Sequence, residues 1–289
     1  MAKLSSPSEI KRILEQHGFH FSKALGQNFL IDDSVCPRMA DRCAAEEVRG
    51  VLEIGPGIGV LTKELAMRAE KVCAVELDKR LLPVLAETLA EFDNVKVVQG
   101  DVLKLDLRQL IETEFGGGPV SVCANLPYYI TSPVIMHLLE SKLPIRSITV
   151  MVQREAAERI CALPGSKACG AVSVGVHYHC RPEILFGVSR GCFMPPPHVD
   201  SAVIRMEVLA EPPVSVDDET FFFGMVRAAF SKRRKTAANS ISSLLSVSKQ
   251  QVETALTACG LPADVRAEKL TLPELAELSN RLLAVSREE

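Results

Sequence analysis

The stretch EIGPGIGVLT, Glu53 to Thr62, decides the fold class that the sequence predicts. Apolar residues lead into it from Val51 and a helical pattern follows it, so a buried strand is expected to end here and a helix to begin. Gly55, Gly57 and Gly59 stand between the two, and residues without a Cβ let the backbone approach a ligand closely. We therefore predict a strand–turn–helix unit of an open α/β sheet, with a ligand site at the turn.

Strand-like and helix-like runs alternate around this stretch, through residues 50 to 160. The apolar, β-rich runs are VLEIG, KVCAVEL, VKVVQG, VSVCANL and SITVMV, and the helical runs include LTKELAMRAE, LLPVLAETLAEF and SPVIMHLLESK. This alternation predicts the α/β fold class, with a mainly parallel, Rossmann-like sheet covered on both faces. After Arg159, the runs GAVSVGVHYHC and VDSAVIRMEVL predict further strands at one edge of the sheet.

The remainder of the chain predicts a smaller helical domain. From about Asp217 the helical runs are FFFGMVRAAF, KTAANSISSLL, SKQQVETALTACG and LPELAELSNRLLAV. The proline-containing stretch EPPVSVDD, Glu211 to Asp218, is expected to be the linker. We therefore predict a ligand-binding sheet domain with an N-terminal extension over residues 1–210 and a C-terminal helical domain over residues 211–289.

The composition limits the class of protein. The chain has 289 residues, of which 47% are hydrophobic, and this is enough for a large core and a second, smaller one. No segment approaches the roughly 20 apolar residues that cross a bilayer, and the N-terminal residues lack the apolar run of a signal peptide. We therefore expect a cytoplasmic protein without a membrane partner.

The cysteines are expected to be reduced and structural. There are nine, an odd number, and they are scattered without a C-x-x-C pair. Cys73 and Cys123 lie within apolar strand-like runs, as small hydrophobic residues do. The stretch VHYHC, with His177, His179 and Cys180, is the one metal-like cluster, but no further ligand stands at a useful spacing. We expect no metal site.

The charge is unevenly distributed along the chain. A formal net charge of −3 argues against a general nucleic-acid binder. A run of four consecutive cations nevertheless follows the apolar run FFFGMVRAAF. It is formed by Lys232, Arg233, Arg234 and Lys235. From charge alone, a solvated helix face and a phosphate contact are both open interpretations.

Polar residues close the predicted parallel strands, at the edge of the sheet where ligands bind. Glu76 closes the second strand about 20 residues after Gly55, where an acidic side chain can accept both hydroxyls of a ribose. Asp101 closes the third strand and Asn125 closes the fourth. Taken singly, each of them is better explained as a helix cap or a turn former.

The spacing of the glycines favours one class of cofactor. A dinucleotide site needs G-x-G-x-x-G, but here the third glycine comes one residue early and Val60 occupies the expected place. S-adenosylmethionine fits better, with Glu76 at its ribose, Asp101 at the exocyclic amine of its adenine and the glycine turn at its methionine end. We therefore predict S-adenosylmethionine as the cofactor.

The stretch NLPYYI, Asn125 to Ile130, predicts a clamp for a planar amine. The exocyclic amine of adenine is a poor nucleophile, because its lone pair is delocalised into the ring. The side-chain oxygen of Asn125 and the carbonyl of Leu126 can accept its two N–H bonds and favour a pyramidal nitrogen in the transition state. Pro127 would stiffen the turn, and Tyr128 would stack on a base removed from its neighbours. The simpler alternative is a tyrosine-bearing turn.

A set of motifs gives the sequence a specific resemblance. The motifs are GQNFL (26–30), EIGPGIGVLT (53–62), VELD (75–78), GDV (100–102), NLPYYIT (125–131), QREAAERI (153–160), FMPPPHVDSAV (193–203) and FSKRRKTAANS (230–240). From about Lys23 to Ser240, the sequence closely resembles the ribosomal RNA adenine dimethyltransferases of the KsgA type. The helices beyond Ser240 match this family only loosely.

The resemblance implies roles for matching residues. It implies that S-adenosylmethionine is held by Asn28, Leu30, Gly55, Glu76, Asp101 and Asn125. It also implies that the NLPY segment positions the target amine and that Phe193 shares with Tyr128 the stacking on the target adenine. The run from Lys232 to Lys235 becomes a contact to RNA phosphates.

The resemblance further implies the reaction, in which four methyl groups are transferred to two neighbouring adenines near the 3′ end of 16S ribosomal RNA. The implied substrate is that RNA within the immature 30S subunit, so we expect a monomer that also serves in subunit biogenesis. Two alternatives stay open. The related methylases that modify a large-subunit adenine and confer macrolide resistance share an NLPY-like clamp, and a non-catalytic assembly factor would occupy the immature subunit without methylating it.

Overall fold

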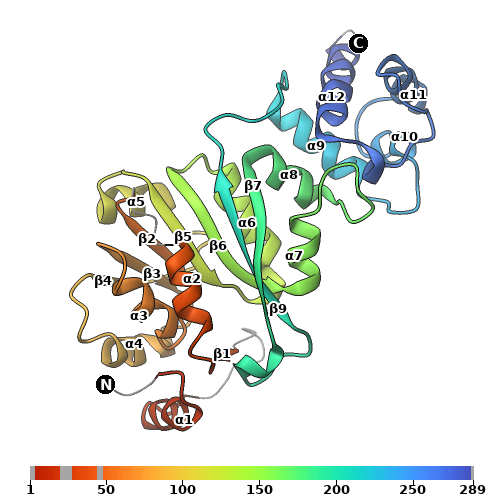
Figure 1. The fold of residues 1–289 in the computed structure, drawn as a ribbon. Helices are drawn as coiled ribbons and strands as arrows, with labels where there is room; N and C mark the ends of the chain where they lie inside the picture. Colours follow the sequence, from red (N-terminus) through yellow and green to blue (C-terminus); the bar gives the residue numbers. More distant parts are fainter. Residues whose placement is uncertain (1–3, 20–27, 44–47, 288–289) are drawn as a thin grey trace. The chain divides into compact units, whose positions relative to one another are not determined.

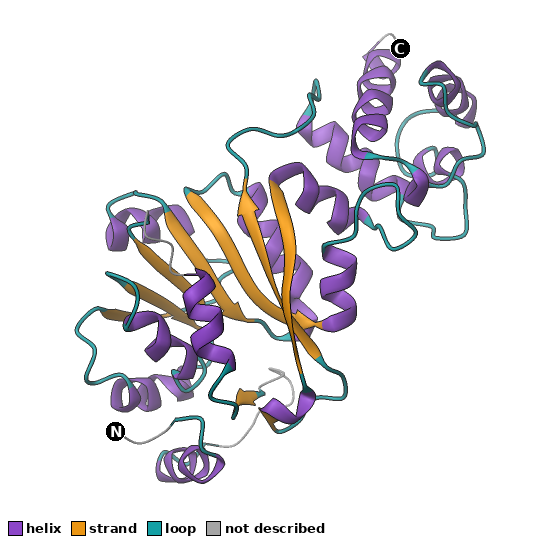
Figure 2. Ribbon diagram, in the orientation of Figure 1, coloured by secondary structure: helices purple, strands orange, loops and turns teal. Residues whose placement is uncertain are grey.

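A seven-stranded sheet dominates the first part of the structure, a computed structural model that describes residues 4–19, 28–43 and 48–287 (Figure 1, Figure 2). The strands lie in the order β4–β3–β2–β5–β6–β9–β7. Their bounds are β2 Gly50–Ile54, β3 Val72–Glu76, β4 Val95–Gln99, β5 Val120–Asn125, β6 Ile145–Gln153, β7 Cys180–Val188 and β9 Ser201–Val208. A separate antiparallel pair joins β1 Phe29–Leu30 to β8 Phe193–Met194. The five strands predicted over residues 50 to 160 are present, and the predicted fold class is confirmed.

Parallel pairing brings the carboxyl ends of β2, β3, β4, β5 and β6 to one edge of the sheet. β2 pairs in parallel with β3 on one side and with β5 on the other, and β4 and β6 extend these pairs outward. The strand order therefore reverses at β2, and ligand sites of open α/β sheets lie at such a reversal. β9 runs antiparallel to β6 with Ser201 opposite Gln153, so the first residue of β9 lies at this same edge.

Helices cover both faces of this sheet. They are α2 Val35–Cys43, α3 Val60–Ala66, α4 Leu82–Thr88, α5 Leu107–Phe115, α6 Thr131–Glu140 and α7 Arg154–Ile160, with short 3-10 turns η2 Lys79–Leu81, η3 Tyr128–Ile130 and η4 Arg190–Cys192. Figure 1 shows α2 and α3 in front of the sheet and α6 behind it. Met39 and Leu65 from the two front helices share an apolar core with Val51, Cys123 and Met151 of the strands. The central strands β2, β3 and β5 are buried along almost their whole length because both of their faces are covered.

The N-terminal helix α1, Pro7–Gln16, packs beside the segment that follows β3. Ile10, Ile13 and Leu14 of α1 are buried in one apolar cluster with Leu81 and Leu85. Three residues of this cluster, Phe29, Ile58 and Leu81, also line a cavity at the edge of the sheet. The apolar face of α1 therefore supports one wall of that cavity from behind.

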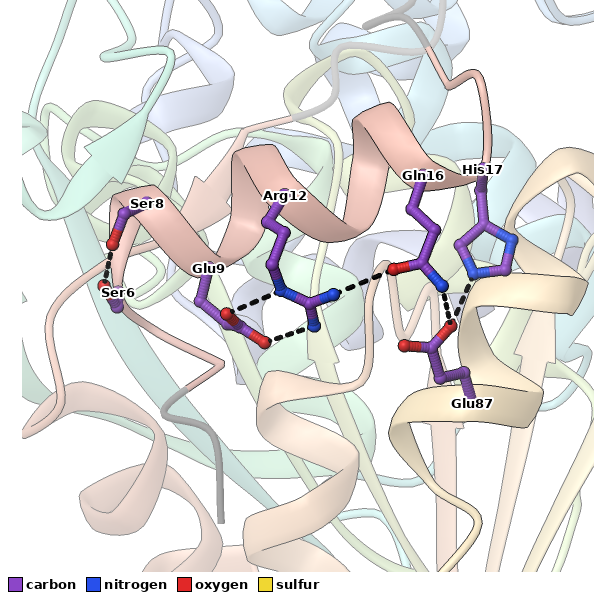
Figure 3. Close-up of polar contacts among 7 residues, drawn as sticks. All are labelled: Ser6, Ser8, Glu9, Arg12, Gln16, His17 and Glu87. Carbon is purple, nitrogen blue, oxygen red and sulfur yellow. Dashed lines mark hydrogen bonds and ion pairs between the residues drawn. The ribbon is translucent and has the colours of Figure 1, made fainter.

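Polar contacts link side chains along α1 and join the end of the helix to α4 (Figure 3). Arg12 Nη2 lies 2.7 Å from Glu9 Oε1, and Arg12 Nη1 donates to Gln16 at 2.8 Å. Beyond the end of the helix, His17 Nε2 lies 2.8 Å from Glu87 Oε2 on α4. Exposed contacts of this kind contribute little individually, so the apolar face supplies most of the attachment.

A second compact unit contains the C-terminal helices. It comprises Glu158–Pro182 and Leu209–Glu289, and the sheet unit comprises Met1–Ala157 and Glu183–Val208. The helices of the second unit are α8 Ala171–His179, α9 Glu219–Ala229, α10 Ala237–Ile241, α11 Lys249–Ala258 and α12 Leu272–Arg287, with a 3-10 turn η5 Ala267–Lys269. They enclose a core of their own, which includes Phe222, Met225, Ile241, Leu256 and Leu275. Each of the four helical runs predicted after Asp217 overlaps one helix, in order α9, α10, α11 and α12.

The division between the units differs from the boundary predicted at residue 211. Residues 158–182 belong to the helical unit, although the predicted domain over residues 1–210 included them. The predicted linker is also anchored, because Asp217 N donates to Asn280 Oδ1 at 2.9 Å and Asn280 Nδ2 donates to the carbonyl of Ser215 at 3.3 Å. Contacts between segments far apart in sequence leave no trace in local composition, so the stretch resembled a free linker.

The strand prediction for GAVSVGVHYHC was wrong. Residues Ala171–His179 form α8, and β7 begins only at Cys180. Ser173 Oγ accepts from Gly170 N at 2.9 Å and donates to the carbonyl of Arg159 at 2.6 Å, which fixes the first turn of the helix. Residues on several sides of α8 are buried. The alternating β-branched residues therefore reflect burial, which overrides their intrinsic preference for strands.

Candidate active site

A cavity opens at the carboxyl ends of the parallel strands, beside the reversal of strand order at β2. It is lined by residues that follow β2, β3, β4 and β5 and by residues of the β1 segment. All six residues predicted to hold the cofactor line it, namely Asn28, Leu30, Gly55, Glu76, Asp101 and Asn125. Gly26 and Gln27 of the first motif lie outside the described residues. The parallel topology thus brings together groups that are far apart in the sequence.

The glycine turn after β2 forms one wall of this cavity. Gly55 has a φ of 70°, and its N–H donates to the carbonyl of Val75 at 2.9 Å. Gly59 has a φ of 91° and directly precedes α3. A Cβ on Gly59 would lie 3.1 Å from the side chain of Leu89, in a backbone region that L-residues rarely adopt. The turn therefore requires glycine at these positions, as the motif predicts.

Glu76 ends β3 with both carboxylate oxygens held by backbone groups. Oε1 accepts from the N–H of Asp78 at 2.7 Å, and Oε2 accepts from the N–H of Gly57 at 3.2 Å. Burial raises the pKa of Glu76 above its ordinary value, and these backbone hydrogen bonds oppose the increase. A carboxylate has about four acceptor positions, so about two remain for the hydroxyl groups of a ligand. This geometry fits a ribose.

Glu53, a buried carboxyl within β2, was not predicted as a site residue. The residue is 1% exposed and lines the cavity, and its Oε2 has no hydrogen-bond partner among the described residues. Burial raises the pKa of Glu53 to about 8. A buried acceptor without a partner fits a ligand that brings N–H donors or positive charge, and S-adenosylmethionine carries both. The signal in the sequence was an acidic residue within the apolar run VLEIG.

Asp101 combines the two roles that the sequence left open. Its Oδ1 accepts from Leu103 N at 3.1 Å, as in a turn former, and its Oδ2 lies 3.6 Å from Lys104 Nζ. The residue also lines the cavity. Lining residues that were not predicted include Ile58, Leu77, Val102 and the exposed Tyr129. Apolar surfaces beside an acidic side chain fit a flat base with an exocyclic amine.

A smaller cavity lies at the NLPYYI turn. Its lining is Asn28, Asn125, Leu126, Pro127, Tyr128 and Phe193, which includes all five residues predicted to take part in the reaction. Asn28, Asn125 and Pro127 line both cavities. A group that is transferred from one cavity to the other would therefore pass beside Asn125.

Asn125 is oriented by a hydrogen bond at the wall between the two cavities. Its Nδ2 donates to the carbonyl of Asn28 at 3.4 Å, so its side-chain oxygen remains as an acceptor for an incoming N–H. Leu126 N donates to the carbonyl of Met151 at 3.2 Å, which ties the turn to β6. Pro127 follows with a φ of −55°, the value to which its ring restricts it, and leads into η3. The clamp is thus built from a fixed amide and a stiff turn.

The two aromatic residues of the smaller cavity differ in burial. Tyr128 is partly buried, its pKa is raised mainly by burial, and its hydroxyl lies 2.9 Å from Ser201 Oγ. Phe193 is 3% exposed and packs in the core with Leu30, its partner in the β1–β8 pair. Tyr128 therefore offers more ring surface for stacking, while Phe193 forms part of the wall.

The four cations predicted to contact RNA lie in the helical unit, after the end of α9. They are Lys232, Arg233, Arg234 and Lys235, and all four are exposed. The N–H of Lys235 donates to the carbonyl of Lys232 at 2.9 Å, so the run forms an exposed turn rather than part of a helix. None of the four side chains forms an ion pair with another described residue.

The described part of the chain holds no evident metal centre. Across residues 4–19, 28–43 and 48–287, no three His, Cys, Asp or Glu side chains are grouped so that they could hold a metal ion. The nine cysteines are free thiols, and six of them are buried. In the same described ranges, no helix has the length and apolar character needed to cross a bilayer.

Known proteins resemble this chain along almost its whole length. Residues 18–283 match the family model described as ribosomal RNA adenine dimethylase. A protein of Alkaliphilus metalliredigens called ribosomal RNA small subunit methyltransferase A is 47% identical over 98% of this chain and 99% of its own. A protein of the same name from Geobacillus thermodenitrificans is 47% identical over 98% of both chains.

Solved structures share the fold of this chain. The 23S rRNA methyltransferase ErmE has a TM-score of 0.66 at 28% identity, over 88% of this chain and 99% of that one. A dimethyladenosine transferase from Plasmodium falciparum has a TM-score of 0.66 at 23% identity, over 90% of this chain and 98% of that one. Together with the two adjoining cavities at the NLPYYI turn, these similarities show that the chain belongs to the ribosomal RNA adenine dimethylase family.

Proposed function

We propose that this protein transfers methyl groups from S-adenosylmethionine to the N6 amines of two adjacent adenosines near the 3′ end of 16S ribosomal RNA, in the immature 30S subunit. The observation that carries the proposal is the pair of adjoining cavities that share Asn125. The small-subunit methyltransferases that are 47% identical to almost the entire chain support the choice of RNA.

The larger cavity suits the cofactor. Glu76 would accept the ribose hydroxyls and Asp101 the exocyclic amine of the adenine, while Asn28, Leu30 and Gly55 complete the lining. Glu53 Oε2, which has no hydrogen-bond partner within the part of the chain that the structure describes, would accept from the cofactor's ammonium group. When bound, S-adenosylmethionine supplies an electrophilic methyl group. A nearby positive charge favours the ionised form of Glu53, so binding of the cofactor at neutral pH is expected to release a proton.

The smaller cavity suits the target adenine. The side-chain oxygen of Asn125 and the carbonyl of Leu126 would accept the two N–H bonds of its amine and turn the nitrogen lone pair toward the larger cavity. Tyr128 would stack on the base, with Phe193 behind it. No strong general base is required, because the methylated amine is cationic and loses its proton readily.

The helical unit is the proposed RNA-binding part of the chain. The side chains of the turn are exposed and form no ion pair with another described residue, which supports a role in contacting phosphates; they are Lys232, Arg233, Arg234 and Lys235. A ribosomal subunit is a very large substrate, and its size favours a monomeric enzyme. A role in subunit biogenesis and a cytoplasmic location are further parts of the proposal.

Two alternative functions receive less support. A large-subunit methyltransferase of the macrolide-resistance type would share the fold, but the 23S rRNA methyltransferase ErmE is 28% identical to this chain, against 47% for the small-subunit enzymes. A non-catalytic assembly factor would not need a complete reaction site. Here every residue predicted for cofactor and amine lines one of the two cavities, which favours an active enzyme.

The choice of RNA can be tested by methyl transfer. Purified small subunits that lack the modification and purified large subunits would each be incubated with the protein and labelled S-adenosylmethionine. We expect label as dimethyladenosine near the 3′ end of the 16S RNA and none in large subunits. Label in large subunits alone would support the resistance-type activity, and binding to small subunits without any label would support the assembly factor.

A further inference from the structure

Ser201 is a buried serine beside the smaller cavity, and the reaction as proposed above does not use it. The residue is 0% exposed and is the first residue of β9. Its Oγ lies 2.9 Å from the hydroxyl of Tyr128. β9 runs antiparallel to β6, with Ser201 opposite Gln153, so its first residue lies where the parallel strands end. The antiparallel strand therefore delivers a hydroxyl group to the reaction edge of the sheet.

The start of β9 is held in place by the residue before Ser201. The carbonyl of Asp200 accepts from Arg154 N at 3.0 Å, and its Oδ1 accepts from Arg190 N at 3.0 Å. Its Oδ2 also lies 3.3 Å from Arg154 Nη2. These contacts come from two different segments, one after β6 and one after β7. The hydroxyl of Ser201 is thus a fixed point rather than the end of a free loop.

A hydrogen bond at this fixed point restricts Tyr128 in one particular way. The backbone of Tyr128 is set by η3, which follows Pro127. The phenolic oxygen lies on the long axis of the ring, so a bond to it prevents the ring from swinging about χ1 but permits rotation about that axis. Swinging about χ1 is the motion that would carry the ring away from the cavity wall. With both ends held, the stacking surface is prepared before a base arrives.

We infer that Ser201 is a positioning residue for methyl transfer, whose hydroxyl holds the ring of Tyr128 at the wall of the smaller cavity. The inference rests on the proposed function of that cavity as the site of the target adenine. In this arrangement the hydroxyl of Tyr128 is hydrogen-bonded to Ser201 and does not take the proton of the target amine. The pH profile of the reaction is therefore independent of this phenol.

A double-mutant comparison separates this role from a merely structural one. The variants are Ser201→Ala, Tyr128→Phe and the two combined, each tested for methyl transfer to unmodified small subunits and for S-adenosylmethionine affinity by calorimetry. Each single variant loses one hydrogen bond, so the maximal methylation rate should fall roughly 3- to 10-fold while cofactor affinity stays unchanged. The combined variant should lose no more than either single one, because both remove the same bond. The pH profile should keep its shape in Tyr128→Phe.

A second buried serine in the same sheet serves as the control. Ser147 is also 0% exposed, and its Oγ lies 3.2 Å from Ser121 Oγ. The variant Ser147→Ala should retain full activity. The inference is overturned if Ser201→Ala is as active as the wild type, if the losses in the combined variant multiply, or if Ser147→Ala loses as much as Ser201→Ala. An inactive wild type in the same assay would instead contradict the proposed function.

Discussion

Replacing Glu76 should weaken cofactor binding and also loosen the glycine turn, because this carboxylate serves both. Its two oxygens already accept from Asp78 N and Gly57 N. Two ribose hydroxyls bonded to the remaining positions would contribute about 1.5 kcal/mol each or more, since the acceptor is charged. In Glu76→Ala, the loss of roughly 3 kcal/mol corresponds to a dissociation constant for S-adenosylmethionine about 150-fold higher.

The same variant should lose some stability. The N–H of Asp78 is bonded to Glu76 in a buried position, and leaving such a donor without a partner costs about 1–3 kcal/mol. Gly57, whose N–H donates to Glu76, lines the cavity, so water is expected to replace the carboxylate there. We therefore expect the Tm of Glu76→Ala to fall by several degrees. Glu76→Gln keeps one acceptor oxygen and should lie between alanine and the wild type in both properties.

Calorimetric titration with S-adenosylmethionine and thermal unfolding would measure the two effects separately. Glu91→Gln is a matched control, because that exposed carboxylate pairs with Lys63 and lies outside both cavities. The control should retain the affinity and the Tm of the wild type. The ribose assignment would be refuted if the dissociation constant of Glu76→Ala for S-adenosylmethionine stayed within threefold of the wild-type value while its Tm fell. Glu76 would then only stabilise the glycine turn.

Two further perturbations test other parts of the account. Glu53 has a pKa of about 8 in the folded protein against an ordinary value of 4.5, so the unfolded chain ionises first and stability should decrease as pH rises from about 4.5 to 8. The free energy of unfolding should fall by up to about 1.4 kcal/mol per pH unit in this range, and Glu53→Gln should remove this contribution. Urea unfolding of both proteins at pH 5.5 and 7.5 would measure the effect. The same pH dependence in both proteins would contradict a raised pKa for Glu53. Neutralising Arg233 and Arg234 should weaken small-subunit binding and flatten its salt dependence while leaving cofactor affinity intact. An unchanged salt slope in binding assays would leave the exposed turn without a phosphate contact.

The parts of the fold that sequence predicted are those that depend on local pattern. Continuous apolar runs between helical runs predicted the five parallel strands, because strands covered on both faces have no polar side. Parallel strands end at one edge, so Glu76, Asp101 and Asn125 were expected to gather there, and they line one cavity. Family membership confirms the methyltransferase activity and S-adenosylmethionine as the cofactor. The individual roles of the lining residues stay predictions.

The features that were missed depend on contacts between distant segments. The helix α8 was taken for a strand because its burial comes from helices that follow it in the chain, such as α9 with Phe222. The contact of Ser201 with Tyr128 depends on the register of β9 against β6, which residue types alone do not give. Glu53 was overlooked because an apolar run does not tell whether an acid within it has a partner.

The most direct test of the central claim is methyl transfer by the wild type and by Asn125→Ala to unmodified small subunits under single-turnover conditions. Asn125 lines both cavities, and its side-chain oxygen is proposed to accept from the target amine. We expect dimethyladenosine with the wild type and a rate reduced at least roughly 100-fold in Asn125→Ala, even when S-adenosylmethionine saturates the variant. A variant that methylated at the wild-type rate once saturated would contradict the clamp and leave Asn125 with the cofactor alone.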